Sequence, residues 1–254
     1  MIYSYFLNGF IGHKPPMSRH FYFSTEEEQF KKNCQELKNW RYENLEITYD
    51  YNSNGHRCKE IDQLNENYIL FVGCSTSDGH AEKLEETYPY ILSKKLNLDY
   101  YNLSLKGSSV NTCYYNLTMF LNKVKIKPKF IVLQWPHFNR YALIHKGGQY
   151  AVYSPWADFN YDYDYDVFKL LHMNELPESH SHFYRKLALE FISNFNIKVI
   201  ELNIMADIKL EKNGYDTTIL QWDNIQNFQD VARDLIHAGP ITNTIWAEKI
   251  AESL

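Results

Sequence analysis

The stretch Tyr68-Ile-Leu-Phe-Val-Gly-Cys-Ser-Thr-Ser-Asp-Gly79 joins a continuous apolar run to a turn rich in glycine and serine. Five consecutive apolar residues without polar alternation are typical of a strand that is buried on both faces of a parallel sheet. The turn after such a strand lies at the carboxyl end of the sheet, where α/β proteins place many functional groups. The stretch therefore predicts the first core strand of an α/β protein, with Ser75 presented directly after it.

Helical and extended patterns alternate along the rest of the chain. Helices are expected at about 87–96, 110–124 and 180–196, with a closing helix that reaches Leu254, and strands at 99–103, 130–134 and 198–203. Strands that alternate with helices of this length favour parallel pairing with helices on both faces. The prediction is a three-layer α/β/α sandwich around a central parallel sheet.

Two segments fall outside this alternation. Residues 1–60 are expected to form an N-terminal extension packed on a domain of residues 61–254, with a helix over about 25–40 and a half-buried strand at 46–51. Residues 135–180 are expected to form an irregular insertion, which follows a core strand as substrate-binding loops often do. Its run Asn160-Tyr-Asp-Tyr-Asp-Tyr-Asp166 lacks the pattern of a calcium loop and is interpreted as a solvated acidic face.

The composition of the 254-residue chain argues against several classes of protein. It has 26 Lys and Arg against 31 Asp and Glu, a net charge of -5 that disfavours a nucleic-acid partner. No apolar stretch approaches the roughly 20 residues needed to span a bilayer, and no secretory signal is visible. The four cysteines show no metal-like spacing. We expect a cytoplasmic chain with no membrane partner, metal or cofactor, while the oligomeric state is left open.

Two polar groups at opposite ends of the chain carry candidate chemistry. The hydroxyl of Ser75 lies at a strand-to-helix turn, where its own backbone N–H can face an oxyanion. Near the C-terminus, Asp234-Leu-Ile-His237 precedes Ala-Gly-Pro240 and the closing helix. A carboxylate three residues before an imidazole can reach the same side of a turn and orient the ring as a base. Each signal alone is weak, because such turns and Asp-x-x-His pairs also occur by chance.

Together, the two groups resemble the SGNH (GDSL-type) hydrolase superfamily, in which a Gly-Asp-Ser-x-x-x-Gly block follows the first core strand and an Asp-x-x-His block precedes the last helix. Gly73, Ser75 and Gly79 match the first block, and Asp234 and His237 match the last. The resemblance implies a flavodoxin-like fold. It also implies that the serine is a nucleophile, the histidine its base and the aspartate the group that orients the histidine.

The middle blocks of the family match less closely. Gly107 corresponds to the glycine whose N–H is an oxyanion donor, and Tyr51-Asn-Ser-Asn-Gly-His-Arg57 is similar to an element found ahead of the serine in some branches. The family's Gly-x-Asn-Asp block is replaced by Gln134-Trp-Pro-His-Phe-Asn-Arg140. The candidates for its side-chain oxyanion donor are Asn139 and, as alternatives, Gln134 and His137. Cys74 replaces the aspartate before the serine and is itself a lesser candidate for the nucleophile.

The resemblance implies a serine esterase that removes small, acetyl-like acyl groups from a small molecule or a glycan. Aromatic side chains of the insertion are candidates for stacking on sugar rings, namely Trp135, Tyr153 and Trp156. Acyl transfer to another hydroxyl would use the same groups. The alternative is a non-catalytic structural or carbohydrate-binding protein with a degenerate fold, such as a virion component, because the third block resembles phage-encoded members. Retention of Ser75, Asp234 and His237 together favours the enzyme.

Overall fold

The computed structural model describes residues 2–13, 24–144, 149–153, 176–203, 210–211, 214–221 and 228–254. Its centre is a five-stranded sheet in which every pairing is parallel, with the order β4-β3-β5-β8-β9. The strands are β3 (Tyr68–Val72), β4 (Asp99–Asn102), β5 (Phe130–Trp135), β8 (Lys198–Asn203) and β9 (Thr217–Gln221). The second strand of this sheet lies on one side of the first and the later strands on the other, which is the flavodoxin-like order.

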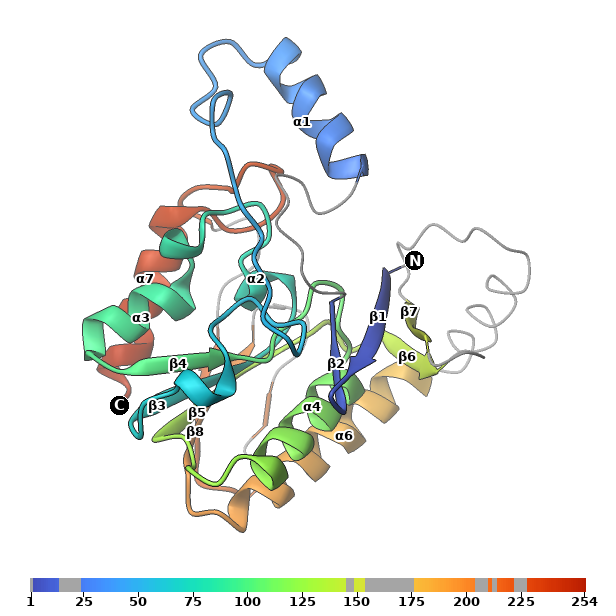
Figure 1. The fold of residues 1–254 in the computed structure, drawn as a ribbon, viewed down its shortest axis with the longest axis vertical. Coiled ribbons are helices and arrows are strands. Elements are labelled where there is room, and N and C mark those ends of the chain that lie inside the picture. Colours follow the sequence, from blue (N-terminus) through green and yellow to red (C-terminus); the bar gives the residue numbers. More distant parts are fainter. Residues whose placement is uncertain are drawn as a thin grey trace.

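Helices cover both faces of this sheet (Figure 1). Helices α3 (Tyr88–Leu96) and α7 (Pro240–Glu252) contact each other on one face, and α4 (Val110–Lys123) and α6 (Leu176–Ser193) contact each other on the opposite face. Within β3, Leu70 packs in the core cluster of α4 and α6, whereas Phe71 packs in that of α3 and α7. Both side-chain directions of the strand are therefore buried, as its apolar run predicts. The predicted three-layer sandwich is confirmed.

The register of the parallel pairs brings several chain segments to one edge of the sheet. Val72 at the end of β3 pairs with Leu133 of β5, and Phe71 pairs with Asn102 of β4. The strand order changes direction at β3, where its two neighbours lead to opposite sides of the sheet. Ligand sites of open α/β sheets lie at the carboxyl ends of strands beside such a switch point. The short helix α2 (Ser75–Asp78) begins at this place.

A second, antiparallel sheet joins the N-terminal residues to the insertion. Its order is β2-β1-β7-β6. The strands are β1 (Ile2–Leu7), β2 (Phe10–Gly12), β6 (Tyr141–Ile144) and β7 (Gln149–Tyr153). The prediction of an irregular insertion was therefore wrong for β6 and β7, which pair with each other, and β7 also pairs with β1 from the distant N-terminus. The acidic run 160–166 lies outside the described residues.

The remaining N-terminal residues differ in part from the prediction. Helix α1 (Ser24–Glu36) ends earlier than residue 40, and no strand forms at 46–51. Ile47, Tyr49 and Tyr51 are nevertheless buried, so the alternation predicted which side chains face inward. Residues 46–51 pair with none of the described strands, and the Thr48 carbonyl accepts a hydrogen bond from the Arg57 guanidinium at 3.1 Å instead.

The other predicted helices and strands agree with the structure to within a few residues, and β9 was missed. Two short 3-10 helices complete the described elements, η1 (Ile61–Gln63) and η2 (Leu84–Glu86). None of the helices in the described ranges combines the length and the apolar character needed to cross a membrane.

A buried ion pair connects the far half of the sheet to its helical cover. The Glu201 carboxylate on β8 accepts hydrogen bonds from Arg185 of α6 at 2.7 and 3.0 Å. It also accepts from the Trp135 indole at 2.7 Å and from the Thr217 hydroxyl at 3.0 Å. Because both charged side chains are almost fully buried, each depends on the other for solvation that water does not supply.

Arg185→Met should lower the free energy of unfolding by about 3 to 5 kcal/mol, because it leaves the Glu201 carboxylate buried without its cation. Lys186→Met, at the next and exposed position of α6, is the matched control and should change stability by less than about 0.5 kcal/mol. Urea unfolding followed by circular dichroism measures both. Equal stability of the two variants would contradict this account of the pair.

Candidate active site

The turn that presents Ser75 depends on two glycines. A Cβ on Gly73 would lie 2.7 Å from the Gln134 Oε1 and 2.7 Å from the Ser77 Oγ, so no larger residue fits without displacing them. Gly79 ends α2 with a φ of +77°, in the left-handed region that favours glycine, and a Cβ there would meet the Thr87 methyl group at 2.2 Å. The spacing of the two glycines around Ser75 thus has a steric cause.

The side chain of Gln134 supports this turn from β5. Its Oε1 accepts the Cys74 backbone N–H at 2.9 Å and the Ser77 hydroxyl at 3.1 Å, and its Nε2 donates to the Trp135 carbonyl at 2.8 Å. Gln134 is fully buried. These bonds favour a structural role for Gln134 over the role of oxyanion donor that was one alternative.

The loop after β4 is bonded to the same turn. The Gly73 carbonyl accepts from the Ser108 hydroxyl at 2.7 Å and from the Leu105 backbone N–H at 3.3 Å. Gly107 lies between these two residues and has a φ of +74°. Gly107, which the family resemblance gives as an oxyanion donor, therefore lies on a loop that is hydrogen-bonded to the serine turn.

The side chains of Ser75, His237 and Asp234 form a continuous chain of hydrogen bonds. The Ser75 Oγ lies 2.7 Å from the His237 Nε2, and the His237 Nδ1 lies 2.5 Å from the Asp234 Oδ2. The other oxygen of Asp234 accepts the backbone N–H groups of Ile236 and His237, both at 3.0 Å. Residues 162 positions apart in the sequence are thus in direct contact.

The charge of Asp234 determines the proton positions in this chain. Burial raises the pKa of this carboxyl, but the His237 ring and backbone and the nearby His80 outweigh it and hold the pKa well below its usual range. A carboxylate only accepts hydrogen bonds, so the proton on the His237 ring belongs on Nδ1. The Nε2 lone pair then accepts the Ser75 hydroxyl proton, which is the arrangement a general base needs.

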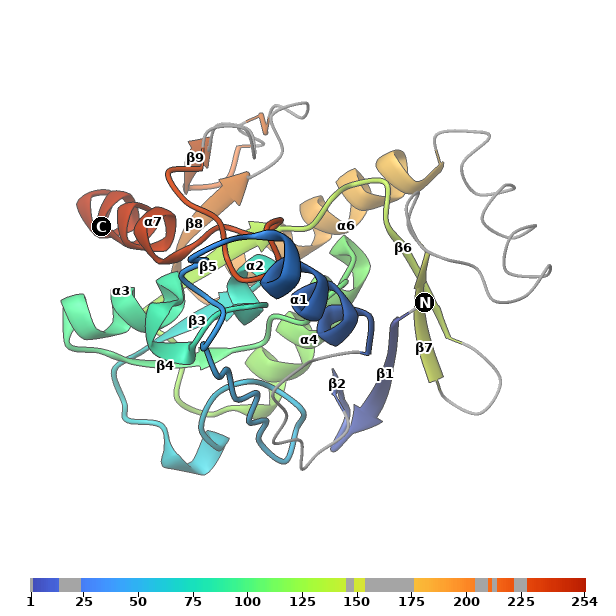
Figure 2. The ribbon, with the colours of Figure 1, turned by 90° about the horizontal axis from the view of Figure 1, so that it is seen from above.

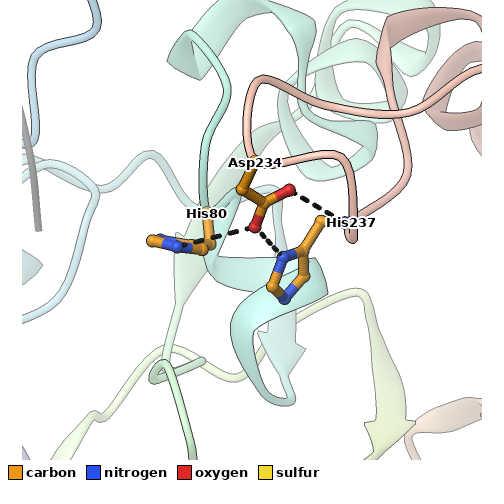
Figure 3. A group of neighbouring side chains, drawn as sticks. All are labelled: His80, Asp234 and His237. Atoms are coloured by element: carbon orange, nitrogen blue, oxygen red, sulfur yellow. Dashed lines mark hydrogen bonds and ion pairs between the residues drawn. The ribbon is translucent and has the colours of Figure 1, made fainter. Parts of the chain in front are cut away.

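His80 lies on the other side of Asp234, with its Nε2 3.7 Å from the Asp234 Oδ2 and its ring edge-to-face with His237 (Figure 3). Burial lowers the pKa of His80 well below its ordinary value, so the ring is neutral at pH 7. Its Nε2 lies 2.6 Å from the Lys106 Nζ, which donates to it. The pKa of Lys106 is also lowered by burial, to about 8.

His80, Asp234 and His237 also offer three potential metal-ligand atoms within 4.8 Å of one another. Two features of the group oppose a divalent cation. The Asp234 oxygen is engaged by His237 at 2.5 Å, and the ammonium of Lys106 stands at the His80 nitrogen. A cation would have to displace this positive charge, so the geometry favours an acid–base arrangement over a metal centre.

The remaining candidates of the sequence analysis have different outcomes. Trp135 is 1% exposed and its indole N–H is bonded to Glu201, so the expectation that it stacks on a sugar ring is wrong. Asn139 and His137 follow β5 and are partly exposed, with the Asn139 N–H 3.4 Å from the His137 Nδ1. The side chain of Tyr153 and the whole of Trp156 lie outside the described residues.

The sequence analysis gave no role to Arg57, which binds the backbone around the end of α2, or to His80, which lies beside Asp234. Arg57 is 1% exposed and donates to the carbonyls of Gly79 at 2.6 Å, Glu82 at 3.0 Å and Asp78 at 3.3 Å. The signal was present in the Asn-Ser-x-Gly-x-Arg element, which predicted no role for the arginine. His80 gave a weaker signal, its place directly after the glycine that ends the serine block.

Comparisons with known proteins return matches only among solved structures. No protein-family model and no curated protein matches the chain. An acetyl xylan esterase from Butyrivibrio proteoclasticus aligns over 76% of this chain and 64% of its own, with 15% identity and a TM-score of 0.44. An esterase from a Pseudoalteromonas species aligns over 74% and 96%, with 10% identity and a TM-score of 0.46.

A third match is an esterase of the SGNH-hydrolase family, AlinE4, which aligns over 54% of this chain and 59% of its own with 15% identity and a TM-score of 0.37. The chain thus spans about two thirds or less of the length of two of these proteins. At such low identity these likenesses concern the general fold only. The chemistry of the site rests on its own geometry and on the sequence blocks.

Asp78→Asn should make stability less dependent on pH. Asp78 is 1% exposed, and burial raises its pKa to about 7, although Arg57, Lys106, His237 and Tyr51 act in the opposite direction. Between about pH 4 and 7 the native chain holds a proton that the unfolded chain has lost, so stability falls as the pH rises. The Asn variant avoids this loss, so its stability relative to the unaltered chain should increase by on the order of 4 kcal/mol between pH 4 and pH 8.

Urea unfolding at intervals from pH 4 to 8 measures the difference between the two chains, in which the titration of all other groups largely cancels. Asp50→Asn, at an exposed position, is the control and should give a difference that is flat with pH. A flat difference for Asp78→Asn, or one that shrinks as the pH rises, would contradict the raised pKa.

Proposed function

We propose that the chain is a serine hydrolase that cleaves ester bonds, with Ser75 as nucleophile, His237 as general base and Asp234 as the group that orients His237. The observation that carries this proposal is the unbroken chain from the Ser75 Oγ through both nitrogens of His237 to the Asp234 carboxylate, with distances of 2.7 and 2.5 Å. A nucleophile, a base and an orienting carboxylate within hydrogen-bond reach are the parts that acyl transfer requires.

In the proposed reaction, the His237 Nε2 takes the Ser75 proton as the Oγ attacks the ester carbonyl carbon. The oxyanion is received by the backbone N–H groups of Ser75 and Gly107, with Asn139 or His137 as the side-chain donor. His237 then protonates the departing alcohol, which leaves an acyl group on Ser75. Water, activated by the same ring, attacks this acyl group and releases the acid.

The proposed substrates are esters of small, acetyl-like acyl groups, on a carbohydrate as the family resemblance implies. Ser75 is only 7% exposed, which favours a small acyl group at the reacting carbon. Cys74 is a poorer nucleophile candidate, because its Sγ lies 3.2 Å from the Gln134 Oε1 and the His237 Nε2 is bonded to the serine. Transfer of the acyl group to a second hydroxyl uses the same residues and belongs to the same proposal.

Hydrolysis of p-nitrophenyl acetate by the purified chain tests this proposal. Ser75→Ala and His237→Ala should each lower kcat by at least about 1,000-fold, because each removes a group without which the others cannot act. Ser193→Ala and His182→Ala, at exposed positions of α6, are matched controls and should keep full activity. Cys74→Ala should retain turnover if Ser75 is the nucleophile.

Turnover that is unchanged by Ser75→Ala or His237→Ala would contradict the proposed mechanism. Absence of turnover on this ester and on acetylated oligosaccharides would favour the non-catalytic alternative. In that case, binding of the unaltered chain to non-acetylated glycans would be the next measurement.

A further inference from the structure

The N-terminal segment 24–45 touches the segment that carries Asp234 and His237 at several separate points. Arg41 forms an ion pair with Asp230 at 2.8 Å, and the Tyr42 hydroxyl donates to the Val231 carbonyl. Glu26 of α1 forms an ion pair with Arg233, also at 2.8 Å. Seen from above, the chain before α7 passes beside α1 (Figure 2). These contacts join residues about 190 to 207 positions apart in sequence.

The Glu26–Arg233 pair is the most enclosed of these contacts. Glu26 is 8% exposed and Arg233 is 2% exposed, so neither charge is solvated by water. The same Glu26 oxygen accepts the Tyr49 hydroxyl at 3.2 Å, and a second guanidinium nitrogen of Arg233 donates to the Leu45 carbonyl at 3.2 Å. A buried pair with several partners holds a fixed geometry, because the loss of one partner leaves the other charge uncompensated.

Arg233 is the residue directly before Asp234, and the tip that follows has little packing of its own. Leu235 has a φ of +62°, which is costly for a residue with a side chain, and Leu235 and Ile236 are 40% and 62% exposed. The segment is closed by backbone bonds from Ala232 to His237 and from Gly239 to Asp230. Its base is fixed to α7, because the Asp230 carboxylate accepts the N–H groups at the start of that helix.

We propose that residues 24–45 clamp the segment 230–239, and that Glu26 is a positioning residue for Asp234 and His237. It acts through Arg233 and through His80, whose Nε2 lies 3.9 Å from the Glu26 Oε2. Helix α1 lies apart from the helices that cover the sheet (Figure 1), and none of its residues belongs to the two core clusters of that sheet. The burial of Glu26 therefore does not serve the packing of the central core. The backbone bonds within the segment set its shape. Its position relative to Ser75 is set by the clamp together with the hydrogen bond from the Arg233 N–H to the Ala81 carbonyl at 3.3 Å. The catalytic consequence of the clamp rests on the proposed function.

Glu26→Gln tests the clamp, because it keeps the size of the side chain and removes the charge that Arg233 needs. Its kcat on p-nitrophenyl acetate should fall by about ten-fold or more, with KM within about twofold, because a small displacement of His237 slows proton transfer without altering ester binding. Backbone amides of residues 231–238 should exchange hydrogen faster, and those of β3 should not. Glu28→Gln, two residues away and exposed on the same helix, should leave all three measurements unchanged.

Tyr42→Phe provides the second variant should Glu26→Gln not fold. It removes the hydroxyl that donates to the Val231 carbonyl and accepts from the Arg41 guanidinium, and should raise exchange in residues 231–238 with a smaller fall in kcat. The proposal is overturned if Tyr42→Phe, and Glu26→Gln where it folds, match Glu28→Gln in kcat and in exchange.

The reaction of Ser75 with a fluorophosphonate separates the two proposals. If the unaltered chain neither turns over ester nor reacts with this probe, the proposed function fails, and exchange in residues 231–238 alone decides the clamp. If the unaltered chain reacts and Glu26→Gln reacts equally fast with unchanged exchange, the proposed function stands and the clamp is wrong.

Discussion

The parallel pairing of β3 with β5 is the constraint on which the rest of the site depends. Because Val72 pairs with Leu133, Gln134 continues β5 at the level where the chain leaves β3 for the serine turn. The side-chain amide of Gln134 can therefore satisfy the Cys74 N–H inside the protein, where water does not reach. The two glycines allow this close approach, and Ser75 is held at the carboxyl edge of the sheet as a result.

The opposite half of the site depends on contacts from outside the sheet. Asp234 and His237 belong to a loop whose tip is exposed and whose backbone includes a left-handed leucine. The buried side of this loop is held by ionic contacts: Glu26 forms an ion pair with Arg233, and Lys106 donates to His80, which lies beside Asp234. The serine turn and this loop meet at the Ser75–His237 hydrogen bond, at the contact of His80 with Asp234, and at the backbone bond from Arg233 to Ala81. Both halves must be in place for these contacts to form.

Several charged side chains are buried in this protein and have fixed hydrogen-bond partners. Arg57 binds the carbonyls that follow α2, while Arg185 and Glu201 connect β8 to α6 in the distant half of the molecule. Such pairs add less stability than apolar packing of the same volume would, but they fix direction and distance. The Glu26–Arg233 pair fixes direction and distance in this way directly beside Asp234.

The sequence by itself determined four of the five strands of the central sheet and the main residues of the candidate site. Continuous apolar runs predicted β3 and β5, because a strand buried on both faces has no polar side, and block spacing singled out Ser75, Asp234 and His237. The alternation at 46–51 predicted burial but not a strand, since it carries no information on backbone partners. Only the tertiary structure decided the β1–β7 pairing, the burial of Trp135 and the contact of Glu26 with Arg233. These depend on which distant segments meet, and such contacts leave no local periodicity in the sequence.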